Sequence, residues 1–273
     1  MFGRRAFVAA LLALPLLSGV WPGSAEAADP PASPVRVLFL GNSITYVGNL
    51  PAVLASLCDA SGHNCSVDMI VKGGAALHDR AIDGSLDRAT VAHRFDYVVL
   101  QERGGDLIDL PDESARKSAE SAAESLVLTA HRLGMKPILL GTYQPWPSSD
   151  PLVAAESNLS ARLKVPHVAV SNYLECGKRE NASLRWLYSD GMHPGSDLTL
   201  MMAMALHREI FGSYPKAVPI TVRAPIYGAS SGLTSESFAS AQPVRPGTAS
   251  SIDYDAATLQ SVLGVLQTKC PEP

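Results

Sequence analysis

Short apolar runs alternate with longer segments of helical periodicity along most of the chain, and this alternation limits the possible folds. Strands that helices cover on both faces read as near-continuous apolar runs. The sequence therefore predicts an α/β fold: a three-layer α/β/α sandwich with a mostly parallel, flavodoxin-like open sheet of about five strands. The expected strands lie in the runs at residues 35–41, 65–74, 95–101, 136–143 and 165–174. The expected helices lie at residues 49–62, 79–93, 112–133, 152–164 and 196–212 and near the C-terminus.

Both ends of the chain differ in composition from this alternating region. Residues 1–27 pass from basic MFGRR through an apolar stretch to a small-residue AEA site, which is typical of a secretory signal peptide. Sec and twin-arginine export both fit this segment. A short linker at 28–34 then precedes a single domain at 35–273. Within that domain we expect a long Ser/Ala/Gly/Pro-rich loop at 214–252 and a C-terminal helix at 253–270.

The charge and the remaining composition exclude several classes of partner. The chain has a formal net charge of −4 and no block of basic residues, so neither nucleic acid nor an anionic membrane surface is expected as a partner. The N-terminal apolar stretch is short and contains Pro15, so no stable membrane anchor is expected. The histidines lack the spacing of a metal site, and no cofactor is expected. The oligomeric state stays open.

Four cysteines follow the expected signal peptide, and none belongs to a Cys-x-x-Cys pair. In an oxidising compartment their default state is disulfide-bonded, with three possible pairings. We favour Cys58–Cys65, which closes a short loop between a helix and a strand. The second pair is then Cys176–Cys270, which would tie the C-terminal helix to the rest of the domain.

Small and polar residues follow the first three expected strands. In open α/β sheets, ligands bind outside the carboxyl ends of the strands. Ser43 follows the first strand, Gly73 and Gly74 follow the second, and Gln101 follows the third. Ser43 has two interpretations, since it could be a turn residue and helix cap or a nucleophile.

A late turn, YSDGMHPG at residues 188–195, carries a carboxylate and an imidazole three residues apart. This spacing lets Asp190 fold back onto Nδ1 of His193, which would leave Nε2 free as a general base. The alternative is a loop before a helix, in which the aspartate caps the turn and the histidine is merely exposed.

Together these segments resemble the blocks of the SGNH/GDSL hydrolase superfamily, and the resemblance spans roughly residues 35 to 212. LFLGNSIT is similar to the first block, VKGGAAL to the second, VVLQERGG to the third and SDGMHPG to the last. The resemblance implies a triad of Ser43, Asp190 and His193. It also implies an oxyanion hole formed by the N–H groups of Ser43 and Gly74 and the side chain of Gln101. We prefer Gly74 to Gly73 because Gly73 would still be leaving the strand.

The sequence departs from this pattern at two places. Asn42 stands where the commoner form has aspartate, and Gln101 and Glu102 replace the asparagine of Gly-x-Asn-Asp in the third block. Glutamine carries the same amide donor on a stem that is one methylene longer.

The function that the resemblance implies is that of a serine esterase that acts on small-molecule or carbohydrate esters. The expected signal peptide adds that the enzyme is exported, periplasmic or secreted. The rim aromatics Tyr46, Tyr143 and Trp146 favour short acyl esters, including acetyl groups on carbohydrate. Two alternatives remain: an acyltransferase that uses the same triad, and a catalytically silent binding or envelope-assembly module of the same fold.

Overall fold

The computed structural model describes residues 33–108, 113–145, 147–235 and 249–268. The expected signal peptide, most of the expected linker, Trp146 and Cys270 lie outside these residues. The described part of the chain contains no helix that is both long and apolar enough to cross a membrane.

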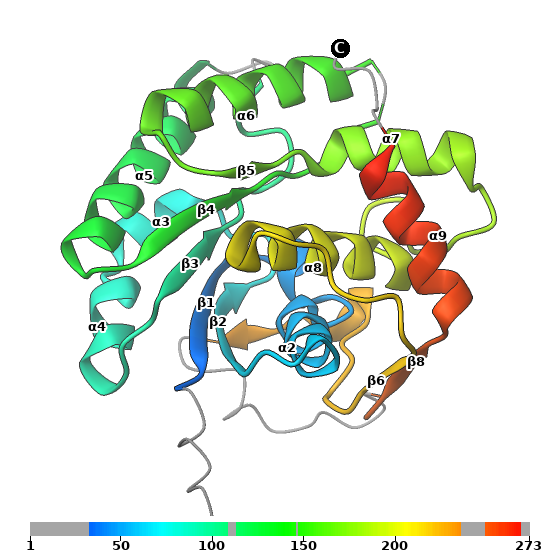
Figure 1. Cartoon of the computed structure of the whole chain (residues 1–273). Helices are drawn as coiled ribbons and strands as arrows, with labels where there is room; N and C mark the ends of the chain where they lie inside the picture. The colour runs from blue at the N-terminus through cyan, green and yellow to red at the C-terminus, as the bar shows by residue number, and fades with distance from the viewer. Residues whose placement is uncertain (1–32, 109–112, 146, 236–248, 269–273) are drawn as a thin grey trace, which may run out of the picture. The chain divides into compact units, whose positions relative to one another are not determined.

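The centre of the domain is a sheet in the order β5-β4-β3-β1-β2-β7, and its first five strands are parallel. This confirms the predicted flavodoxin-like, mostly parallel open sheet of about five strands. Figure 1 shows the arrangement of these strands between the helices. β7 is a two-residue antiparallel addition beside β2. The strands are β1 (Val35–Gly41), β2 (Cys65–Lys72), β3 (Tyr97–Leu100), β4 (Lys136–Leu140), β5 (His167–Val168) and β7 (Thr234–Ser235).

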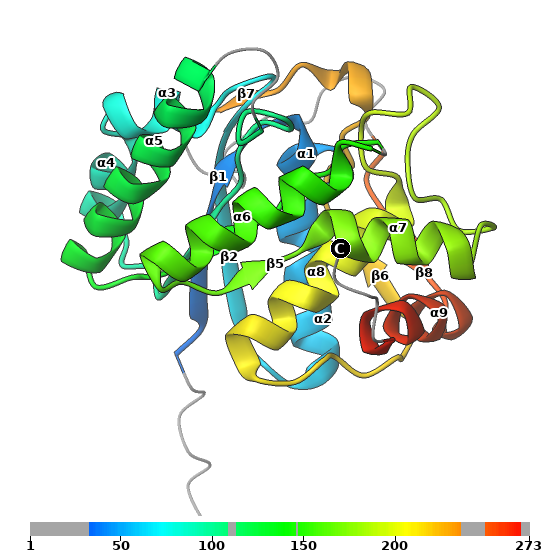
Figure 2. The ribbon, with the colours of Figure 1, turned by 90° about the horizontal axis from the view of Figure 1, so that it is seen from above.

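Helices cover both faces of the sheet and bury two apolar cores. Successive residues of β1 alternate between these cores: Val37 and Phe39 belong to one, and Leu38 and Leu40 to the other. The first core is covered by α2 (Leu50–Ser61), α7 (Val170–Glu180), α8 (Ser196–Phe211) and α9 (Ala256–Gln267). The second core is covered by α3 (Leu77–Ile82), α4 (Ser85–Ala92), α5 (Glu113–Arg132) and α6 (Ser149–Leu163). Figure 2 shows this three-layer arrangement from above.

The structure corrects the expected secondary structure in three regions. The expected helix at 79–93 is divided into α3 and α4, with Gly84 at a positive φ between them. The expected strand at 165–174 is limited to β5, because α7 begins at Val170 and buries Val170 and Leu174 at helical spacing. The expected loop at 214–252 contains β6 (Ile220–Val222), a short 3₁₀ turn and β7. β6 pairs with β8 (Ile252–Tyr254), so the C-terminal helix begins after that strand and not at residue 253.

A disulfide joins Cys58, near the end of α2, to Cys65, the first residue of β2. This confirms the first predicted pairing. Cys176 is buried in α7, which packs against α9, but Cys270 lies outside the described residues. The pairing Cys176–Cys270 therefore stays a prediction.

Replacing both Cys58 and Cys65 by alanine should lower the free energy of unfolding by roughly 2–3 kcal/mol, because the unfolded chain regains the entropy of a short open loop. Denaturant unfolding of the oxidised parent and the double variant measures this difference. Reduction of the parent should give a loss at least as large. An unchanged unfolding midpoint in the double variant would contradict the stabilising role of this bond.

Candidate active site

Ser43 lies immediately beyond the carboxyl end of β1, as the first residue of the short helix α1 (Ser43–Tyr46). The N-cap of this helix is Asn42, whose side-chain oxygen accepts a hydrogen bond from the Ile44 N–H at 3.0 Å. The capping role considered for Ser43 therefore belongs to its neighbour. The Ser43 hydroxyl is partly exposed and makes no hydrogen bond within the described part of the chain.

The Asn42 side chain also joins the loops that follow β2 and β3. Its Nδ2 donates to the Ala75 carbonyl at 3.1 Å and to the Glu102 carbonyl at 3.2 Å. The residue is only 2% exposed, so these bonds replace hydration that the amide has lost. Only an amide can accept the cap bond through oxygen and donate two bonds through nitrogen. This accounts for asparagine at a position where the commoner form of the block has aspartate.

The two glycines after β2 differ in what their N–H groups do. The Gly73 N–H donates to the Leu233 carbonyl at 3.1 Å, so it is already used. Gly74 has a positive φ of 71°, which favours glycine, and among the described residues its N–H has no acceptor. Of the two, Gly74 is therefore the one with an N–H available to a ligand.

Gln101 follows β3 and is 1% exposed. Its Oε1 accepts from the Thr45 hydroxyl, and its Nε2 faces the Gly141 carbonyl at 3.5 Å. Gln101 therefore links the ends of β1, β3 and β4. The second amide hydrogen is the one left for the predicted oxyanion contact.

The structure brings Asp190 and His193 into direct contact in the turn before α8. Asp190 Oδ2 lies 2.7 Å from His193 Nδ1, and Oδ1 accepts from the N–H groups of Met192 and His193. Gly191 has a positive φ of 67°, which allows the chain to fold back tightly enough for these bonds.

These hydrogen bonds favour the ionised form of Asp190 and select the tautomer of His193. The pKa of Asp190 is lowered to about 2, and the largest cause is the hydrogen bond from the backbone N–H of His193. The hydrogen bonds from the Met192 N–H and from the His193 ring lower it further. An ionised carboxylate can only accept, so Nδ1 of the neutral imidazole carries the hydrogen and Nε2 keeps its lone pair. The pair can therefore act as a general base through Nε2.

The Asp190 turn is attached to the edge that carries Ser43 through a residue the sequence did not single out for this role. The Tyr143 hydroxyl, after β4, donates to the Met192 carbonyl at 2.8 Å. Burial raises the pKa of Tyr143, so the phenol stays a neutral donor. No hydrogen bond joins Ser43 to His193 among the described residues, and catalytic hydrogen bonds often tighten only when substrate binds.

Of the aromatic residues expected at the rim, Tyr46 and Tyr143 do not form an exposed binding platform. Tyr46 and Tyr143 are buried, because Tyr46 packs edge-on against Tyr227 and Tyr143 bonds the Asp190 turn. Trp146 lies outside the described residues. Tyr46 and Tyr143 therefore do not support the expectation of a carbohydrate substrate that was based on aromatic residues at the rim.

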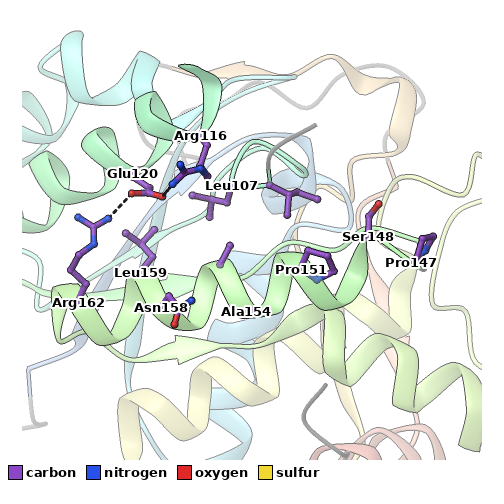
Figure 3. Close-up of a pocket in the computed structure, with 12 residues that line it drawn as sticks. Leu107, Arg116, Glu120, Pro147, Ser148, Pro151, Ala154, Asn158, Leu159 and Arg162 are labelled. Atoms are coloured by element: carbon purple, nitrogen blue, oxygen red, sulfur yellow. Dashed lines mark hydrogen bonds and ion pairs between the residues drawn. The ribbon is translucent and has the colours of Figure 1, made fainter. Parts of the chain in front are cut away.

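Two hollows lie near this edge. One has a volume of about 270 Å³ and is lined by Tyr143, Gln144 and Asp190, among others. The other, of about 800 Å³, is more apolar and lies between α5 and α6 (Figure 3). Glu120 bonds both Arg116 at 2.7 Å and Arg162 at 3.0 Å there. Glu113 and Glu124 each lie 3.6 Å from one of these arginines, so both cations of this groove are paired with carboxylates. None of the predicted site residues is among the described residues that line it.

No cluster of three or more potential metal-ligating side chains occurs in the described ranges.

The parallel sheet thus has a serine after β1 and a hydrogen-bonded aspartate–histidine pair before α8. No family model and no curated protein matches the sequence. Among solved structures, the chain is similar to an SGNH hydrolase candidate from Slackia heliotrinireducens (22% identity, TM-score 0.53, 65% of this chain and 100% of that one). It is also similar to a GDSL-like lipase candidate from Parabacteroides merdae (14%, 0.51, 64% and 95%) and to TesA (18%, 0.50, 65% and 98%). The chain has the fold of the SGNH/GDSL hydrolase superfamily.

Replacing Asn42 by aspartate should destabilise the protein by about 1–3 kcal/mol, because two buried carbonyls lose their donor and face a carboxylate. Asn42→Ser is the matched control, since it keeps a capping oxygen but adds no charge, and it should cost less. Denaturant unfolding at pH 7 measures both. Equal stability of Asn42→Asp and the parent would contradict the bridging role of this amide.

Proposed function

We propose that the chain is an exported serine ester hydrolase in which Ser43, His193 and Asp190 form the catalytic triad. The observation that carries the proposal is the Asp190–His193 pair, because its hydrogen bonds leave Nε2 as the basic nitrogen. Ser43 supports it further, since Asn42 supplies the helix cap and the serine hydroxyl has no hydrogen-bond partner among the described residues. Export rests on the signal-peptide pattern of residues 1–27.

In the proposed mechanism, Nε2 of His193 takes the proton of Ser43 as Oγ attacks the ester carbonyl carbon. The tetrahedral intermediate then collapses, the carbon–oxygen bond to the alcohol breaks, and His193 returns the proton to the leaving oxygen. Water enters, loses a proton to His193 and attacks the acyl-enzyme, which releases the acid and restores Ser43. Asp190 stays ionised throughout and stabilises the imidazolium.

The negative oxygen of both tetrahedral intermediates needs hydrogen-bond donors. We assign the N–H groups of Ser43 and Gly74 to this role, because neither has another acceptor among the described residues. Gln101 is the proposed third donor, through the amide hydrogen that does not face Gly141. Loss of one such donor typically lowers kcat by about 10²–10³.

We propose short acyl esters as the substrate class, with acetyl groups on carbohydrate as one member. The support is that the large apolar groove between α5 and α6 includes none of the proposed catalytic residues, so it offers the reacting serine no chain-length pocket. Among p-nitrophenyl esters from acetate to palmitate, kcat/KM should therefore be highest for the shortest acyl groups. A preference for palmitate would contradict this assignment.

Replacing Ser43 or His193 by alanine should abolish hydrolysis of p-nitrophenyl acetate, since the nucleophile or its base is lost. Asp190→Asn should lower kcat by about 10³–10⁴, because the amide no longer holds the required tautomer. Thermal midpoints should change little in the serine and histidine variants.

The chain offers close controls for these variants. Ser189→Ala and His78→Ala change an exposed serine in the same turn and an exposed histidine after the Gly-Gly segment. Both should retain activity near that of the parent. Parental turnover in Ser43→Ala on every cleaved ester would exclude the triad mechanism.

Gln101→Ala should lower kcat more than it raises KM, because the oxyanion bond strengthens as charge develops. Gln101→Asn should be partly active, since the amide is kept but withdrawn. Thr45→Val is the matched control: it removes the Thr45–Gln101 bond and leaves the amide in place. The assay uses an alkyl acetate, a poor leaving group, for which oxyanion stabilisation matters most. If Thr45→Val lost as much kcat as Gln101→Ala, the glutamine would be structural only.

A further inference from the structure

A buried carboxylate contacts the segment of residues 74–77, and the proposed mechanism does not use it. Glu102 follows Gln101 and is 5% exposed. Its Oε1 accepts from the Leu77 N–H at 3.0 Å and from the Arg103 N–H at 2.7 Å. Its Oε2 is buried and has no hydrogen-bond partner among the described residues.

The contacts of Glu102 belong to a set that attaches residues 74–77 to the end of β3. The backbone carbonyl of Glu102 and that of Ala75 share the same donor, Asn42 Nδ2. Arg103 Nη1 lies 3.5 Å from the Gly74 carbonyl. The bond from the Leu77 N–H attaches the far end of this segment, where α3 begins and the Leu77 side chain enters the second core. Gly74 itself, with open space around it, has no side chain to fix its position.

We propose that Glu102 is a positioning residue that holds residues 74–77 against the end of β3 and so aims the Gly74 N–H at the oxyanion. This inference rests on the proposed esterase function, and it deepens the account of that site. Glu102 touches neither the reacting atoms nor the substrate. Glu102 acts through its hydrogen bond with the Leu77 N–H. Its role therefore differs from that of its neighbour Gln101, which is proposed to donate a hydrogen bond to the oxyanion.

The surroundings of Glu102 favour its neutral form. Burial, the largest cause, raises its pKa to about 7, while the N–H groups of Arg103 and Leu77 oppose this shift. Asp106 and the Arg103 guanidinium are the charged groups on its own loop, and Asp79 on α3 faces Arg103. A cavity of about 20 Å³ separates Glu102 from Glu156 and His167, which pair with each other at 3.1 Å, and α5 contributes only apolar side chains there.

A neutral carboxyl keeps Oε1 as an acceptor, so the positioning role does not need the charge. Glu102→Gln imitates the neutral form and retains that acceptor. Glu102→Leu removes the acceptor and leaves two N–H groups without their partner. The two variants therefore separate the hydrogen bond from the charge.

For hydrolysis of an alkyl acetate, kcat of Glu102→Leu should fall at least tenfold with KM within about twofold of the parent, while Glu102→Gln should stay within about threefold in both. Backbone amide hydrogen exchange of residues 74–77 should be faster in Glu102→Leu and parental in Glu102→Gln. Parental kcat in Glu102→Leu, or unchanged exchange in this segment, would overturn the positioning role.

A second pair of variants covers the case in which Glu102→Leu does not fold. Leu77→Pro removes the N–H that bonds Glu102, at the first position of α3, where proline is tolerated and Ala76 already has the extended conformation it requires. Leu77→Ala truncates the same side chain and keeps the N–H. The proline variant should lose kcat relative to the alanine variant, and equal kcat values would overturn the proposal.

The exchange measurement also separates this proposal from the proposed function. If the parent hydrolysed no ester, the proposed esterase function would be wrong, and the Glu102–Leu77 bond would have no catalytic role. If the parent hydrolysed esters but exchange and kcat were unchanged in Glu102→Leu, only the role of Glu102 would fail.

The raised pKa of Glu102 gives an independent pH dependence. Between 4.5, the ordinary value, and about 7, the folded state binds more protons than the unfolded state, so stability falls as pH rises through this window. This component should be absent from Glu102→Gln. Unfolding free energies of the two proteins at pH 4.5 and pH 7.5 measure it, and parallel pH profiles would contradict the neutral buried carboxyl.

Discussion

The hydrogen bonds of the Asn42 side chain are the interaction on which the proposed site depends. Parallel strands end at one edge of a sheet, but nothing in the sheet itself fixes the loops that leave them. Asn42 starts α1 through its oxygen and joins the two following loops through its nitrogen. The same residue therefore places Ser43, restrains the segment that contains Gly74 and anchors the end of β3. A change in this amide would alter all three at once.

The second half of the site is built differently, from a local turn. Asp190 and His193 are held mainly by bonds within their own turn, and the Tyr143 hydroxyl supplies a long-range attachment. This arrangement lets the dyad keep its tautomer independently of the Asn42 contacts. The Tyr143 bond from the end of β4 and the packing of α8 against α2 connect the two halves. The position of Ser43 relative to His193 therefore depends in part on the register of β1, β3 and β4.

Much of this could be read from the sequence, because the signals are local. The apolar runs predicted the five parallel strands, and the spacing of Asp190 and His193 predicted their contact. The early end of β5 and the start of α7 were missed because residues 165–174 form a largely apolar run whose type depends on tertiary packing. The bonding of Glu102 and Gln101 was also out of reach, since Thr45, Leu77 and Gly141 meet them only after the sheet has formed. Gln101 and Glu102 are the two residues at which the sequence departs from the third block.

The central claim is that Ser43 is a nucleophile activated by His193, and the acyl-enzyme tests it most directly. Rapid mixing of the protein with p-nitrophenyl acetate, quenching in acid and peptide mass mapping would locate the acyl group. The account predicts a burst of p-nitrophenol and one acetyl group on the peptide that contains Ser43, with neither in His193→Ala. An acetyl group on another residue, or ester hydrolysis with unmodified Ser43 and no burst under conditions where deacylation is slow, would contradict it.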